Sequence, residues 1–175
     1  MSYLAPISIV GGHGGSPFNF IGAKTGALLK KLDVCVGPTQ VRSVTVLMSD
    51  DVKETFGTAK GASDKMLSFD FEGDEYFSVL TLWPNNNGEY LGGIKFKTTK
   101  GNTFEAVLTN GKLSMPPTKV DVGSGMCFGV QGRSGTEVNK TCKTTLNHMT
   151  VCQMLKIKLQ FLGEGLLFLL LHLHV

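Results

Sequence analysis

The chain has 175 residues, a net charge of +3 and only 18% charged residues. This length suits a single domain of ordinary size. Because no run of basic residues is interleaved with aromatic ones, we expect no nucleic-acid partner. The 22 glycines, together with the many Val, Thr and Phe residues, favour β-structure.

The N-terminal stretch "MSYLAPISIV" lacks a basic segment and has a proline inside its apolar part. It does not resemble a signal peptide, so we expect a cytoplasmic or non-classically secreted protein. The cysteines form no C-x-x-C pair and have no zinc-ligand spacing with the histidines; they are Cys35, Cys127, Cys142 and Cys152. We therefore expect free thiols and predict no metal and no cofactor.

Glycine is concentrated in "GGHGGSPFNF", residues 11–20. Such freedom of the backbone suits a phosphate cradle, a loop whose N–H groups approach another ligand, or tight turns in a β-rich fold. A dinucleotide-binding loop requires a helix directly after it. The next residues, "SPFNFIG" (16–22), are typical of a strand, which argues against a dinucleotide site.

Three later segments alternate apolar and polar residues with a period of two. In residues 41–48, Val44, Val46 and Met48 share one face, and residues 66–71 and 94–99 show the same alternation. This pattern is typical of half-buried strands.

Turn sequences separate these segments: Gly37-Pro38, Asn87-Gly88, Lys100-Gly101-Asn102 and Asn110-Gly111. Each is a hairpin signal between apolar runs. Strand and turn recur about every 10 to 15 residues, which predicts an all-β barrel, sandwich or prism.

The pattern changes after Asn139. Residues 140–153 are weakly patterned, residues 155–162 alternate again, and residues 165–175 are almost wholly apolar. That last run is well short of the roughly 20 residues of a membrane-spanning helix, so we expect no transmembrane anchor there.

Two Gly-rich stretches, residues 11–20 and 121–139, flank the patterned region. Between them lie "KETFG" (53–57), "LTLW" (80–83) and "LGGIKFKTTKGNTF" (91–104). In this order the motifs resemble those of the jacalin-related lectins, and most of all the N-terminal lectin domain of fish natterin-like proteins. The resemblance assigns residues 3–139 to a jacalin-type domain and leaves residues 140–175 as an atypical C-terminal extension.

The resemblance implies an all-β fold, the β-prism I, with three Greek-key sheets of four strands about a pseudo-threefold axis. In the family an apolar closing strand directly follows the second glycine-rich loop. Here "KTCKTTLNHM" stands in its place. We therefore expect residues 155–162 to supply a replacement closing strand, or the strand to be missing.

The resemblance also implies a metal-free site for mannose- or galactose-type glycans, formed by the N-terminal loop and a late loop of the form Gly-x-x-Gly-x-x-x-Asp. The carried-over residues are Gly14, Gly15, Gly135, Thr136, Glu137, Val138 and Asn139. Asn139 stands where the family has Asp, so the charge and one acceptor oxygen are lost.

The sequence thus predicts a carbohydrate-binding lectin whose partners are glycans. We also expect that the protein can form a homodimer, and that it contacts membranes only through glycans or the apolar tail. Two alternatives stay open: a structural or interaction prism that binds no sugar, and a truncated relative of an aerolysin-like pore-forming toxin. We predict no enzyme, because Asp50 and Asp51 suit a solvated turn and no second carboxylate completes a hydrolase pair.

Overall fold

Antiparallel strands make up the part of the chain that the computed structural model describes, residues 8–22, 25–58, 60–137 and 143–153. These residues form eleven strands and no helix. The strands are β1 (Ser16–Ile21), β2 (Leu29–Val36), β3 (Val41–Met48), β4 (Lys53–Gly57), β5 (Lys65–Asp70), β6 (Phe77–Pro84), β7 (Leu91–Thr98), β8 (Thr103–Val107), β9 (Thr118–Val120), β10 (Cys127–Glu137) and β11 (Lys143–Gln153).

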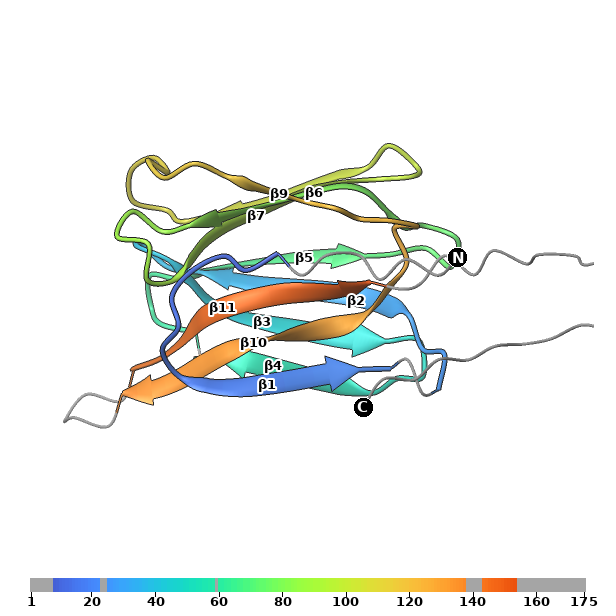
Figure 1. Ribbon diagram of the computed structural model, residues 1–175, viewed down its shortest axis with the longest axis horizontal. Coiled ribbons are helices and arrows are strands. Elements are labelled where there is room, and N and C mark those ends of the chain that lie inside the picture. The colour runs from blue at the N-terminus through green and yellow to red at the C-terminus, as the bar shows by residue number, and fades with distance from the viewer. Residues whose placement is uncertain (1–7, 23–24, 59, 138–142, 154–175) are drawn as a thin grey trace, which may run out of the picture.

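The strands form three sheets with one recurring order (Figure 1). The second sheet has the order β4-β3-β2-β5 and the third the order β8-β7-β6-β9. In each, three strands joined by hairpins are followed by a fourth that returns beside the first, which is a Greek key. The first sheet has the order β1-β10-β11. In it β1 pairs with β10, the first strand of the β10–β11 hairpin, just as β5 pairs with β2 in the second sheet. The predicted all-β prism is confirmed; within the described residues its first sheet has three strands.

The predicted strands agree closely with the observed ones. Residues 41–48 are β3, and Val44, Val46 and Met48 are at most 1% exposed. The turns at Gly37-Pro38, Asn87-Gly88 and Lys100-Gly101 join consecutive paired strands. The hairpin expected at Asn110-Gly111 is wrong. Those residues form a bend between β8 and β9, which lie at opposite edges of the third sheet.

The core lies between the inner faces of the sheets, and Phe96 of β7 is central to its aromatic part. Its side chain is 2% exposed. Its ring centroid lies 5.0 Å from that of Phe69 in the second sheet, 4.9 Å from Phe77 and 4.9 Å from Phe104. Phe18 of β1 stacks on Phe56 of β4 at 4.0 Å. Aromatic contacts thus join the second sheet to both of the others.

The strand that follows β10 comes from a segment with weak sequence patterning. β11 pairs with β10 from Cys127 to Glu137, and the register shifts where Arg133 lies opposite His148 and Ser134 opposite Leu146. This bulge adds one residue, so the apolar positions 146, 149 and 151 are not evenly spaced. A period-two pattern therefore could not show in the sequence.

Residues 154–175 lie outside the described residues, and with them the closing strand expected at 155–162. In the described part of the chain, no helix is long and apolar enough to cross a membrane.

Candidate ligand-binding site

The N-terminal glycine loop precedes β1 at one end of the prism. Gly11 and Gly15 have φ values of 102° and 74°, which favour glycine. The N–H of Gly12 donates to the carbonyl oxygen of Glu89 in the β6–β7 turn at 3.0 Å. A Cβ on Gly12 would lie 2.7 Å from that oxygen, so a larger residue would push the loop off the turn. His13, Gly14 and Gly15 are exposed.

Strand pairing brings the end of β10 beside this loop. Ser16, the first residue of β1, lies opposite Ser134 of β10. Gly14 and Gly15 directly precede Ser16, and Gly135 directly follows Ser134. Two segments about 120 residues apart in the sequence therefore meet at one end of the first sheet, where β1 begins.

Arg133 connects the two segments directly. Its Nε donates to the carbonyl oxygen of Gly14 at 3.1 Å, and its Nη2 donates to that of Gly15 at 2.6 Å. Among the described residues, the N–H groups of Gly14 and Gly15 have no hydrogen-bond partner. Arg133 is not among the residues predicted from the sequence; its place between Gly132 and Gly135 was the available signal.

The late loop differs from the expectation in its backbone. Gly135, Thr136 and Glu137 belong to β10 and lie opposite Thr145, Thr144 and Lys143 of β11. The expected open loop therefore continues as a strand at these three positions, because β11 pairs with it. The pairing with β1 stops at Ser134. Val138 and Asn139 lie outside the described residues.

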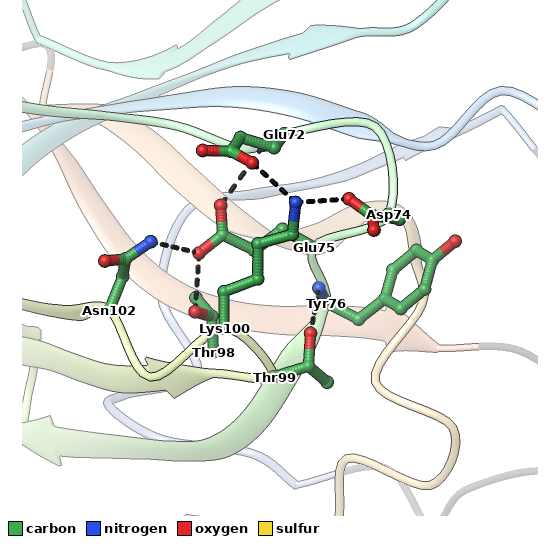
Figure 2. A network of polar contacts seen from close by, with 8 residues as sticks. All are labelled: Glu72, Asp74, Glu75, Tyr76, Thr98, Thr99, Lys100 and Asn102. Carbon is green, nitrogen blue, oxygen red and sulfur yellow. Dashed lines mark hydrogen bonds and ion pairs between the residues drawn. The ribbon is translucent and has the colours of Figure 1, made fainter.

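A second polar cluster joins the β5–β6 turn to the β7–β8 turn (Figure 2). The carboxylate of Glu75, which is 3% exposed, accepts hydrogen bonds from Thr98 at 2.5 Å and Asn102 at 2.8 Å. Burial raises the pKa of Glu75, but these hydrogen bonds, the one from the backbone N–H of Glu72 and the charge of Lys100 together outweigh it, so the pKa lies below its ordinary value. Lys100 pairs with Glu72 and Asp74.

This cluster lies away from the glycine loop. The β6–β7 turn, which touches Gly12, and the β7–β8 turn lie at opposite ends of β7.

Within the cluster, the hydrogen bonds that Lys100 donates to Asp74 and Glu72 raise the pKa of Lys100, and the bond to Asp74 lowers the pKa of Asp74. In Figure 2 the dashed lines join Glu75 to Thr98 and Asn102, Lys100 to Glu72 and Asp74, and the backbone N–H of Tyr76 to the hydroxyl of Thr99. These contacts fasten the two turns together.

Other candidate groups give no site in the described residues. Asp50 and Asp51 lie in the exposed turn between β3 and β4, where Asp51 pairs with Lys30 at 2.8 Å. In the described part of the chain, no group of three or more His, Cys, Asp or Glu residues has the geometry to hold a metal ion.

Compared by sequence with models of protein families and with curated proteins, the chain gives no match. Solved structures do match. Wild-type Malaysian banana lectin has a TM-score of 0.61 at 18% identity, over 86% of this chain and 98% of that one. The artocarpin–mannotriose complex has a TM-score of 0.61 at 15% identity, over 89% of this chain and 99% of that one. The chain thus has the β-prism fold of the jacalin-related lectins.

Among individual proteins, the chain is similar to a lamprey immune protein. The two are 40% identical with a TM-score of 0.75, and the match covers 88% of this chain. It covers 45% of the lamprey chain, so this chain spans less than half of that protein's length.

Proposed function

We propose that this chain is a carbohydrate-binding domain whose site lies where the glycine loop meets the end of β10. The observation that carries the proposal is the junction itself: Arg133 holds the carbonyl oxygens of Gly14 and Gly15, and the N–H groups of these two exposed residues have no partner among the described residues. Backbone donors that side chains do not cover suit the hydroxyl groups of a sugar ring.

Mannose-type glycans are the first ligands to test. Solved structures of this fold include a mannose-binding lectin from Champedak and artocarpin with mannotriose bound. We propose binding without a metal ion, through hydrogen bonds alone. A shallow, wet site of this kind should bind one sugar in the millimolar to high-micromolar range, about 4 to 6 kcal/mol. Several sites on one assembly would raise the avidity.

Gly15 offers a direct test with a matched control. Gly15 and Gly26 share a φ of 74°, but they lie beyond opposite ends of β1. We expect Gly15→Val to abolish binding of methyl-mannoside and methyl-galactoside, because the branched side chain strains the loop and covers the N–H groups. Gly26→Val imposes the same local strain away from the site, so the affinity of this variant for both sugars should equal that of the wild type. Titration calorimetry measures both.

The proposal fails if the wild type binds neither sugar and no glycan on an array. The chain would then be better described as an interaction prism. It also fails at this location if Gly15→Val folds, as judged by its circular-dichroism spectrum, and still binds sugar with unchanged affinity.

A further inference from the structure

Arg133 is half-buried on β10, and its guanidinium is directed at the backbone of another segment. Among the described residues its partners are two carbonyl oxygens, those of Gly14 and Gly15, and no carboxylate. Hydrogen bonds from a charged donor are roughly twice as strong as neutral ones. Two such bonds to successive carbonyls fix both peptide planes of the loop tip.

The local strand geometry explains why this side chain reaches the loop. Arg133 lies opposite Pro17 of β1, two residues after Gly15. β1 pairs with β10 from Ser16 to Ile21 without a register shift. Arg133 is therefore placed where β10 can contact the residues that precede β1.

The other side of the loop is held independently. Gly12 donates to Glu89 of the β6–β7 turn, so the loop is attached to the third sheet on one side of His13 and to Arg133 on the other. A short exposed loop with two attachments loses little conformational freedom when a ligand binds.

The orientation of the peptide groups follows from these contacts. In a trans peptide the C=O and the following N–H point in opposite directions. The carbonyl of Gly14 is held by Arg133, so the N–H of Gly15 points away from Arg133. A charged donor on the carbonyl also polarises the same peptide group and strengthens its N–H as a donor.

We propose that Arg133 is a positioning residue, which fixes the Gly14–Gly15 peptide group so that the N–H of Gly15 is ready to bind a sugar hydroxyl. The inference rests on the proposed function for its ligand, but the ordering of the loop is testable by itself. No sugar contact is assigned to Arg133.

The test compares Arg133→Met, Arg133→Lys and the control Lys97→Met. Lys97 is exposed on β7 near the β7–β8 turn, at the opposite end of that strand from the turn that contacts Gly12. NMR relaxation gives the order parameters of the Gly14 and Gly15 amides, titration with methyl-mannoside and methyl-galactoside gives the affinity, and thermal unfolding gives the stability of the whole domain.

We expect Arg133→Met to lower the loop order parameters from about 0.85 to below about 0.6. We expect it to weaken sugar binding at least about tenfold, which corresponds to about 1.4 kcal/mol, while the unfolding temperature changes little. Arg133→Lys should recover part of both effects, because an ammonium group can hold one carbonyl at a time. Lys97→Met should leave all three measurements unchanged.

An ordered loop in Arg133→Met would overturn the inference, and so would a loosened loop with unchanged sugar affinity. If Arg133→Met does not fold, Arg133→Lys decides by the same two measurements. If the wild type binds no sugar and yet the loop loosens in Arg133→Met, the proposed function fails while the ordering role of Arg133 stands.

Discussion

Asn139 is the position at which the sequence departs from the acid of the jacalin-related pattern. It lies outside the described residues, so the expectation for it rests on chemistry. Asn keeps one acceptor oxygen and replaces the other by a donor, whereas a carboxylate accepts two hydroxyl protons. We expect Asn139→Asp to strengthen binding of methyl-mannoside or methyl-galactoside by roughly five- to thirty-fold, about 1 to 2 kcal/mol.

The control for this change is Asn110→Asp, which adds the same charge at an exposed bend between β8 and β9. Its affinity for both sugars, measured by the same titration, should match that of the wild type. Unchanged binding in Asn139→Asp would mean that the missing charge does not limit the site, and it would favour the interaction-prism alternative.

At the scale of elements, the second polar cluster, which surrounds Glu75, fastens the β5–β6 turn to the β7–β8 turn. Glu75→Gln removes the charge that Thr98 and Asn102 stabilise, and we expect the free energy of unfolding at pH 7 to fall by about 1 to 3 kcal/mol. Because the pKa of Glu75 is lowered in the folded protein, its stabilisation is complete above the ordinary value of 4.5 and is lost as the pH falls through the folded pKa.

Urea unfolding between about pH 2.5 and 7 measures this effect. The difference between the wild type and Glu75→Gln should narrow as the pH falls, because protonated Glu75 is also neutral. Glu105→Gln is the matched control: Glu105 forms an ion pair with Lys95 in which both side chains are about half exposed, and it should cost at most about 1 kcal/mol. A difference that does not depend on pH would show that the charge of Glu75 is unimportant.

At the scale of the whole molecule, the aromatic core holds the sheets together. Phe96 is 2% exposed and contacts aromatic rings from both the second and the third sheet. We expect Phe96→Ala to lower the free energy of unfolding by about 3 to 5 kcal/mol, because it removes a buried ring and leaves a cavity. Met66→Ala, at a side chain that is 44% exposed, should change it by about 0.5 kcal/mol or less. Urea denaturation followed by circular dichroism compares the two, and equal losses would contradict this account of the core.

The sequence by itself determined most of the strands and three of the hairpins. These features are local: a period of two places Val44, Val46 and Met48 on one face, and Asn87-Gly88 or Lys100-Gly101 supplies the conformation that a tight turn requires. The motif order also indicated the β-prism. It pointed to Gly14, Gly15 and Gly135, which the fold brings together at one end of the first sheet.

Only the tertiary structure decided the rest, because the features involved depend on partners far away in the chain. Asn110-Gly111 has the composition of a hairpin turn, yet the sheet order sends β9 to the opposite edge from β8. β11 contains a register shift against β10, which hides its alternation. Arg133 bonds to residues 118 and 119 positions earlier. No local pattern encodes that contact, since it exists only once β1 and β10 are paired.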